Sequence, residues 1–211
     1  MENNYTVEAI NLKKVFGRRL IFKGLNYKFE NNGIYGIAGA NGSGKSTLVK
    51  IIAGVTAPSA GKLIHSFNDV VVKPESLHDH IGLVSPYLVL YDEFTAWENL
   101  SLFAEIRGVS FNKDKAGSIL KNFNIYDRKD DYVKTYSSGM KQRLKFAFAF
   151  MHSPQMVILD EPISNLDNEG KETVYNLIRT ESENAIIIIA SNEDTDLNLC
   201  SSVITITDYK N

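Results

Sequence analysis

The sequence predicts an α/β fold, with a parallel-sheet core, an N-terminal antiparallel β-subdomain and an inserted α-helical subdomain. Two continuous apolar runs, Met156–Leu159 and Ala185–Ala190, predict strands that are buried on both faces. A helical stretch at 168–180 lies between them, which completes a β-α-β unit. Short alternating segments come first and helical periodicity dominates the middle, so we expect the two subdomains in that order.

The N-terminal part is expected to supply short strands. Tyr5–Ile10 and Leu25–Phe29 alternate between apolar and polar residues, and Leu20–Phe22 follows a Gly-Arg-Arg turn. Ile34–Ala38 is apolar throughout and leads into a glycine-rich loop, while Ser202–Thr207 alternates again and is expected to close the core. These segments predict strands on both sides of the helical middle.

The middle of the chain predicts helices at 95–107, 113–123 and 138–151. Thr95 and Glu98 have the spacing of a capping box, which marks the first helix start. We therefore expect one domain over residues 1–211. Its catalytic core comprises 1–85 and 137–211, and its helical subdomain comprises 86–136.

Composition excludes several classes of protein. Of the 211 residues, 44% are hydrophobic and 23% charged, and the net charge is −2, so no nucleic-acid partner is expected. Cys200 is the single cysteine and fits a reducing compartment. The apolar runs of the chain fall far below the roughly 18 residues that span a bilayer, so any membrane role must come through a partner.

A glycine-rich run follows the strand at 34–38 and matches the pattern G-x-x-x-x-G-K-S/T: Gly39, Ala40, Asn41, Gly42, Ser43, Gly44, Lys45 and Ser46. A strand before this motif and a helix after it are the context of a phosphate-binding loop. Glycines let backbone N–H groups turn inward, and the helix start favours an anion. We expect Lys45 to reach the terminal phosphates, Ser46 to ligate Mg²⁺ and Thr47 to donate to a phosphate.

A second acidic pair ends the strand at 156–159. Asp160 is expected at the carboxyl edge of the parallel sheet, beside the phosphate loop, where it can hold Mg²⁺. Glu161 can then orient the attacking water or accept its proton. The sequence therefore predicts ATP and Mg²⁺ as ligands, with Glu161 as a catalytic residue.

Three further segments resemble the ABC family of ATPases. The run from Tyr136 to Arg143 resembles its signature motif, which includes Ser137, Ser138 and Gly139. Ser164-Asn165-Leu166-Asp167 resembles its D-loop, and Phe16 resembles the aromatic residue that stacks on adenine. The resemblance runs in order from about Leu12 to Asn192.

This resemblance implies a P-loop NTPase core of the RecA-like type. It also implies a nucleotide-sandwich dimer, formed with an identical or a different second nucleotide-binding subunit. Each ATP would lie between one chain's phosphate loop and the signature motif of the other chain, with Asp167 nearby. The dimer would drive a transmembrane permease subunit from a cytoplasmic, peripheral position on the inner face of the cell membrane. Small exporter-type ATPases are similar in size and plan.

Two positions depart from the family pattern. Pro86 stands where the family has a glutamine that touches the metal and the attacking water, and Ser85 could replace it only if the register shifts by one. Asn192 stands where the family has a histidine that reaches the γ-phosphate. Asparagine still donates a hydrogen bond but stays neutral, so we expect a reduced catalytic role for Asn192.

These departures leave three interpretations of the site open. It hydrolyses ATP slowly through Glu161, it is a degenerate site paired with a competent chain, or the substitutions carry no loss. Two alternatives to a transporter energy subunit also remain: a regulatory nucleotide-binding subunit without turnover, and a soluble ABC-type ATPase that acts outside transport. The retained Lys45, Ser46, Asp160 and Glu161 favour binding with at least slow hydrolysis.

Overall fold

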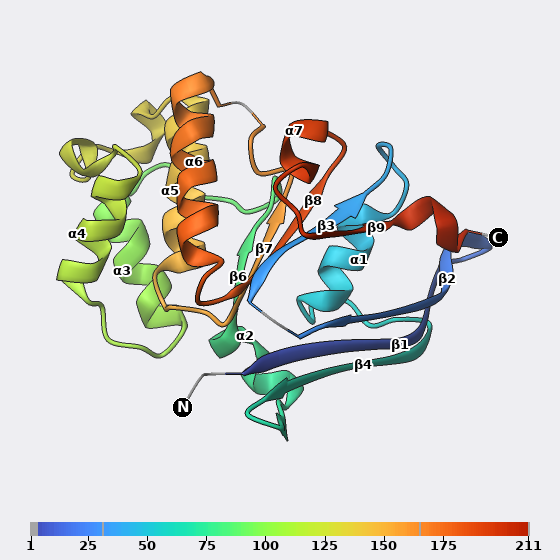
Figure 1. Cartoon of the computed structure of the whole chain (residues 1–211). Coiled ribbons are helices and arrows are strands. Elements are labelled where there is room, and N and C mark those ends of the chain that lie inside the picture. The colour runs from blue at the N-terminus through green and yellow to red at the C-terminus, as the bar shows by residue number, and fades with distance from the viewer. Residues whose placement is uncertain (1–3, 31, 165, 211) are drawn as a thin grey trace.

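A five-stranded parallel sheet lies at the centre of the computed structural model, which describes residues 4–30, 32–164 and 166–210 (Figure 1). Its strand order is β6-β7-β8-β3-β9. The strands are β3 (Gly33–Ala38), β6 (Ile81–Val84), β7 (Met156–Asp160), β8 (Ile186–Ser191) and β9 (Ser202–Thr205). The predicted α/β fold is confirmed, and the two apolar runs are the adjacent strands β7 and β8.

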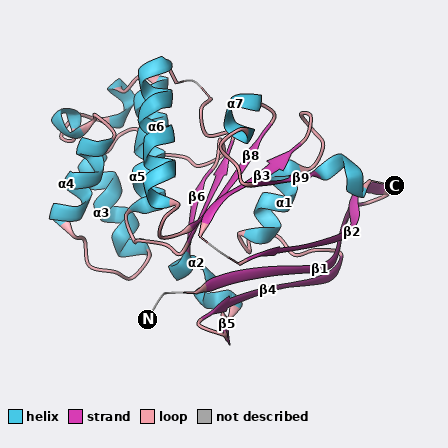
Figure 2. Ribbon diagram, in the orientation of Figure 1, coloured by secondary structure: helices cyan, strands magenta, loops and turns pink. Residues whose placement is uncertain are grey.

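An antiparallel sheet of order β2-β1-β4-β5 lies beside this core, on the side of helix α1 (Figure 2). Its strands are β1 (Tyr5–Phe16), β2 (Arg19–Phe29), β4 (Ala60–Phe67) and β5 (Val70–Val71). The expected N-terminal β-subdomain is therefore present. Its strands are longer than the sequence indicated.

The helices are α1 (Lys45–Ile52), α2 (Leu77–His80), α3 (Ala96–Ile106), α4 (Lys113–Asn122), α5 (Ser138–Phe150), α6 (Asn168–Glu181) and α7 (Asp194–Leu197). Thr95 and Glu98 form both bonds of the predicted capping box at the start of α3. Helices α3 and α4 fall within the expected insertion, and the division at residues 86 and 136 stays a prediction.

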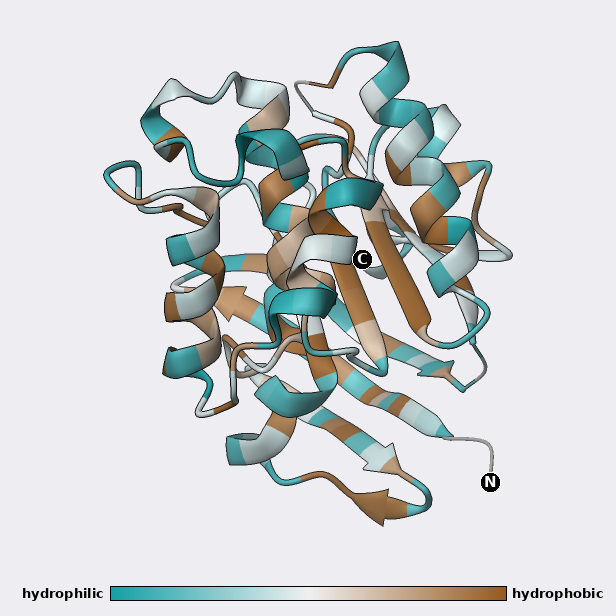
Figure 3. Cartoon of the chain, turned by 90° about the vertical axis from the view of Figure 1, so that its left-hand side faces the viewer, coloured by the Kyte–Doolittle hydropathy of each residue, from teal (hydrophilic) through white to brown (hydrophobic). Residues whose placement is uncertain are grey.

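The parallel sheet separates two hydrophobic clusters. Val157 and Leu159 of β7 pack into the cluster that includes the helices α3 to α6. Met156 and Ile158 of the same strand pack into the cluster shared with α1 and the antiparallel sheet. Successive strand residues point to opposite faces, so a strand buried on both faces must be apolar at nearly every position. In Figure 3 the core strands are accordingly brown, the colour of hydrophobic residues.

Two expected boundaries were wrong, and one strand was not expected. The segments expected at 20–22 and 25–29 belong to one strand, because Gly24 (φ 69°) takes up the irregularity between them. Strand β6, only four residues long, was not expected. The final strand ends at Thr205, and the next residues turn into a 3₁₀-helix at 206–209.

No helix among the described residues is both long and apolar enough to cross a membrane.

The carboxyl ends of three core strands meet at one edge of the sheet. Ala38 pairs with Ser191, and Asp160 pairs with Ala190. The phosphate loop after β3, the acidic pair after β7 and Asn192 after β8 are therefore carried to the same edge. Parallel-sheet proteins bind ligands at this edge.

Candidate nucleotide-binding site

The loop at 39–44 joins β3 to α1 in a conformation that requires glycine. Gly39 (φ 154°) and Gly44 (φ 119°) both have backbone angles that other residues rarely adopt. A Cβ on Gly39 would lie 2.5 Å from Ser43 Oγ, and a Cβ on Gly44 would lie 2.5 Å from a methyl carbon of Ile21. Larger residues at these two positions are therefore excluded by both strain and space.

Lys45 is the cation at the start of helix α1. Its side chain is only 5% exposed, and Nζ donates a hydrogen bond to the Gly39 carbonyl at 2.7 Å. Nζ also lies 3.3 Å from Glu161 Oε1, which makes an ion pair. A buried ammonium group at a helix N-terminus is well suited to binding phosphate.

Ser46 and Asp160 bring two oxygen donors together. The Ser46 hydroxyl donates to Asp160 Oδ1 at 3.2 Å, and Asp160 is 1% exposed. Burial raises the pKa of Asp160, while the Ser46 hydrogen bond and the charges of Lys45 and Lys50 act in the opposite direction. A cation beside this carboxylate would favour its charged form.

These oxygen donors fit Mg²⁺, which prefers such ligands. The described residues contain no group of three or more histidine, cysteine or acidic side chains that could hold a metal. Ser46 and Asp160 would therefore hold the ion together with phosphate oxygens and water, as Mg²⁺ sites in phosphate-transferring enzymes commonly do.

Glu161 has an unusual backbone conformation. Its φ of 52° lies in the left-handed region, which is costly for a residue with a side chain. Its N–H donates to the Ala190 carbonyl at 2.9 Å, and the Ser164 hydroxyl donates to its carbonyl at 3.0 Å. These bonds hold the strained residue so that its carboxylate lines a cavity beside the phosphate loop.

A cavity of about 470 Å³ joins the phosphate loop to the hairpin of β1 and β2. This volume suits a small-molecule ligand. Phe16, at the end of β1, is 53% exposed and contributes an aromatic face. The predicted binding residues that line it are Phe16, Asn41, Gly42, Gly44, Lys45, Ser46, Thr47 and Glu161. Gly39 and Ser43 shape the loop, and Asp160 reaches the site through Ser46.

The other predicted site residues lie away from this cavity. Ser137 is exposed at the start of α5, where its hydroxyl accepts a hydrogen bond from the Met140 N–H at 3.2 Å. Asp167 is exposed at the start of α6 and accepts from the Gly170 N–H at 2.8 Å. Asn192 is exposed beyond β8, Ser138 and Gly139 follow Ser137, and Asn165 of the expected D-loop lies outside the described residues.

Pro86 lines the cavity of about 470 Å³ and Ser85 does not. The Ser85 hydroxyl instead accepts a hydrogen bond from the Tyr87 N–H at 3.3 Å and is directed toward a second cavity. Lys145 Nζ donates to the Pro86 carbonyl at 3.3 Å and holds this segment against α5. Pro86 is therefore the residue of this segment that faces the site, and its match to the family's glutamine position stays a prediction.

Three residues that line the cavity were missed by sequence reasoning: Arg19, Ile21 and Tyr87. Arg19 pairs with Phe16 across the β1–β2 hairpin, and its Nη2 donates to the Gly42 carbonyl at 3.3 Å. The hairpin turn after Phe16 could have indicated this position. Tyr87 lines both cavities, and its ring lies 4.5 Å from Lys50 Nζ. No local signal separates Tyr87 from other exposed tyrosines.

The comparisons with known proteins agree with this geometry. The sequence profile described as "ABC transporter" matches residues 22–164. The chain is 32% identical over 206 residues to the uncharacterized ABC transporter ATP-binding protein YybJ of Bacillus subtilis, with 92% of this chain and 89% of that protein covered. It is 28% identical over 185 residues to the linearmycin resistance ATP-binding protein LnrL of the same organism, covering 87% of this chain and 60% of LnrL.

Several relatives are longer than this chain, which spans 60% of LnrL and just over half of others. Among solved structures, a putative ABC transporter ATP-binding protein from Pyrococcus furiosus has the same fold. It superposes with a TM-score of 0.83 at 22% identity, covering 98% of this chain and all of that one.

Proposed function

The chain belongs to the ABC transporter family as an ATP-binding protein, and we propose that it hydrolyses ATP within a nucleotide-sandwich dimer that drives a transmembrane partner. The observation that carries this proposal is a cluster of four side chains: Lys45, Ser46 and Glu161 line one cavity, and Asp160 accepts a hydrogen bond from Ser46. Together they provide phosphate binding, metal ligation and a base.

Each of these side chains has a separate task. Lys45 binds the β- and γ-phosphates, and Phe16 stacks on the adenine at the other end of the cavity. A Mg²⁺ ion held by Ser46 and Asp160 would neutralise charge on the phosphates. Glu161 orients the attacking water or accepts its proton, and its fixed backbone keeps the carboxylate in place.

The proposed dimer rests on the positions of Ser137 and Asp167. Both are exposed helix caps that do not line the cavity of their own chain. The Ser137 hydroxyl accepts the capping bond, so its own proton is left to donate to a phosphate. A second nucleotide-binding subunit, identical or different, would place this helix N-terminus against the γ-phosphate, where the helix dipole favours an anion.

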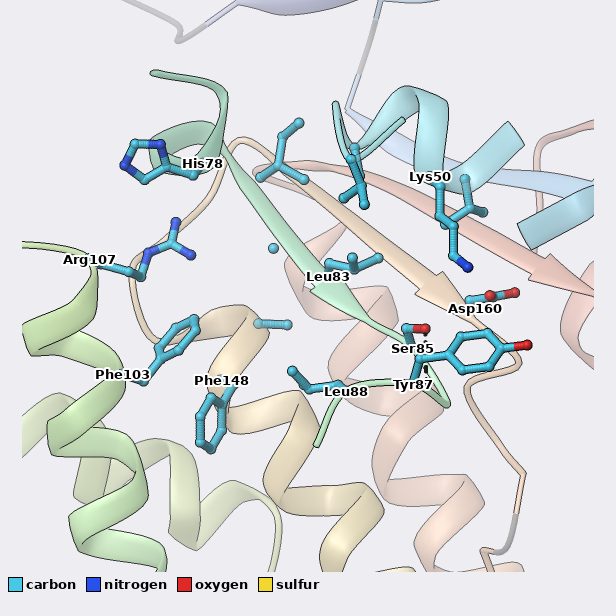
Figure 4. Close-up of a pocket in the computed structure, with 16 residues that line it drawn as sticks. Lys50, His78, Leu83, Ser85, Tyr87, Leu88, Phe103, Arg107, Phe148 and Asp160 are labelled. Atoms are coloured by element: carbon cyan, nitrogen blue, oxygen red, sulfur yellow. Dashed lines mark hydrogen bonds between the residues drawn. The ribbon is translucent and has the colours of Figure 1, made fainter. Parts of the chain in front are cut away.

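A second cavity supports docking of a transmembrane permease. It has a volume of about 370 Å³ and lies between the core and the helical region. Figure 4 shows side chains from α1, β6, α3 and α5 around it, including Leu83, Phe103 and Phe148. An apolar cavity of this kind suits a segment of a partner. With a transmembrane permease as that partner, the chain would lie in the cytoplasm, at the inner face of the membrane.

Phosphate release by the purified chain tests hydrolysis. We expect Glu161→Gln to lower turnover by roughly 10²–10⁴-fold, the usual contribution of a general base, while equilibrium ATP binding remains. Lys45→Ala should weaken ATP binding itself, and Lys62→Ala, on the exposed face of β4, serves as the matched control. Equal turnover of Glu161→Gln and the unchanged chain would refute the role of Glu161.

Pro86 and Asn192 favour a second candidate function, a nucleotide-binding subunit with slow or no turnover. Pro86 lines the cavity without a side-chain donor or acceptor, and Asn192 stays neutral. Tight Mg²⁺-ATP binding without phosphate release in the pure protein would favour this candidate. Turnover that appears only with a second, different nucleotide-binding subunit would identify a paired degenerate site.

A further inference from the structure

The second cavity has apolar walls but, at one end, a cation that forms no ion pair with any described residue. Arg107 and His78 lie together there, away from Lys50, Asp160 and Tyr87 at the other end (Figure 4). Arg107 is the residue at the C-terminal end of helix α3, and its guanidinium stacks on the Phe103 ring at 5.2 Å from the ring centre. Arginine in such a cavity is a strong anchor for a binding partner.

The guanidinium of Arg107 has no full set of partners within the described part of the chain. Its Nη2 is buried and has no hydrogen-bond partner there, and no carboxylate forms an ion pair with it. Burial lowers the pKa of Arg107, although arginine stays protonated. A buried donor without an acceptor lowers stability, and an ionised one does so more strongly.

The neighbouring charged groups do not supply the missing acceptor. Asp79 attracts Arg107 through space but forms no ion pair with it. Its carboxylate is 55% exposed and lies 3.4 Å from His78 Nε2 instead. His152 is neutral at physiological pH, since burial and the charge of Arg107 lower its pKa to about 4. Its Nε2 faces the Ile81 carbonyl at 3.2 Å, so the ring is held by the backbone.

We infer that the docking segment of the transmembrane partner carries an aspartate or glutamate that pairs with Arg107, while its apolar side chains fill the cavity. This inference rests on the proposed docking of a permease. A carboxylate matches the planar fork of a guanidinium with two parallel hydrogen bonds, which a single carbonyl cannot do. The apolar walls strengthen such a pair by excluding water.

The experiment uses the complex of the full chain with the membrane protein that co-purifies with it in detergent. Arg107→Lys retains the charge and provides an amine at this position. A zero-length carbodiimide reagent joins amines to carboxylates in direct contact, and mass spectrometry identifies both residues. We expect a link from position 107 to an Asp or Glu of the membrane protein, and no such link in the control Ile106→Lys, because Ile106 is exposed on the neighbouring helix face.

Charge reversal gives an independent measurement. Arg107→Glu is expected to lower the amount of retained membrane protein at least about tenfold, as loss of a buried interfacial charge pair does. Arg179→Glu, on the exposed face of α6, should leave it unchanged. Equal ATP binding by both variants shows that the chain still folds.

The outcomes separate the two claims. If the unchanged chain retains no membrane protein, the proposed function fails. If it does, but Arg107→Lys forms no link and Arg107→Glu retains the partner normally, the inference is overturned. If Arg107→Glu loses the partner while Arg107→Lys forms no link, the acceptor is a backbone carbonyl and the inferred carboxylate is rejected.

Discussion

Lys45 and Glu161 show how single residues can serve two states of the site. Their ion pair at 3.3 Å occupies both side chains, and Lys45 also donates to the Gly39 carbonyl. A phosphate oxygen that binds Lys45 competes with Glu161 for the same ammonium group. Nucleotide binding would then free the Glu161 carboxylate to face water, so the base becomes available only when the phosphates are in place.

His65 allows a prediction about pH. The ring lies on β4 and is 4% exposed, with Nδ1 2.9 Å from the Tyr5 hydroxyl. Burial lowers the pKa of His65 to about 4, and His80 acts in the same direction, while the backbone of Ile52 acts in the opposite direction. The folded chain therefore keeps His65 neutral while the unfolded chain takes up a proton below about pH 6.5, so acidification lowers the free energy of unfolding.

We expect this group to contribute a loss of up to about 2 kcal/mol between pH 6.5 and pH 5, since each pKa unit corresponds to about 1.4 kcal/mol. Urea unfolding across this range should show a smaller loss for His65→Asn than for the unchanged chain. His152 retains its own dependence in both proteins, and buried Asp160 acts in the opposite direction, so the difference between the two curves is the measurement. Parallel curves would contradict the prediction.

At the scale of elements, helix α5 combines a structural cap with a proposed phosphate contact. Ser137 satisfies the Met140 N–H, and the following helix packs its apolar face against the sheet. Lys141 pairs with Asp92 at 2.7 Å and Lys145 donates to the Pro86 carbonyl, so α5 is fastened to the segment that lines both cavities. The position of the Pro86 backbone is therefore tied to that of α5.

Substitutions at Ser137 separate the cap from the phosphate contact. Ser137→Ala should lower the free energy of unfolding by about 1 kcal/mol, because the cap is lost. Ser137→Asp should keep stability within about 0.5 kcal/mol, since aspartate is an equally good cap, and yet abolish ATP-dependent dimerisation through repulsion of the γ-phosphate. Urea unfolding and light scattering measure the two effects, and an intact dimer of Ser137→Asp with ATP would refute the proposed contact.

At the scale of the whole molecule, one sheet organises two sites on two surfaces. Its carboxyl edge carries the phosphate loop and the acidic pair, and its β6 side faces the apolar cavity beside α3 and α5. Tyr87 is the single described residue that lines both cavities. Docking and nucleotide binding can therefore influence one another through a short segment after β6.

Mixing two defective chains tests the proposed assembly. In a sandwich dimer each site uses the phosphate loop of one chain and the signature motif at the start of α5 of the other. Lys45→Ala and Ser137→Asp should each fail to dimerise with ATP when a Glu161→Gln background slows hydrolysis. An equimolar mixture should form dimers, because one of its two composite sites is intact. The Glu161→Gln chain without further change is the reference. If it forms dimers with ATP and the mixture does not, the assembly in trans is contradicted.

Local features could be predicted from the sequence because neighbouring residues determine them. The apolar runs of β7 and β8, the glycine loop and the Thr95 cap depend on interactions within a few residues. Strand β6 could not be predicted, because its four residues form a strand only when paired with β7. The full length of β1 and β2 likewise depends on the pairing of the two strands with each other, which continues on both sides of Gly24.

The sequence by itself determined the glycine loop after β3 and the acidic pair after β7, because each is a pattern of adjacent residues. The signature segment and the departures at Pro86 and Asn192 stay predictions from the family resemblance. Only the tertiary structure decided that Pro86 rather than Ser85 lines the cavity beside the phosphate loop, that Arg19 joins Phe16 there, and that Arg107 Nη2 is buried beside an apolar cavity without a hydrogen-bond partner among the described residues. Such placements depend on how segments far apart in the chain pack together, and no local pattern encodes them.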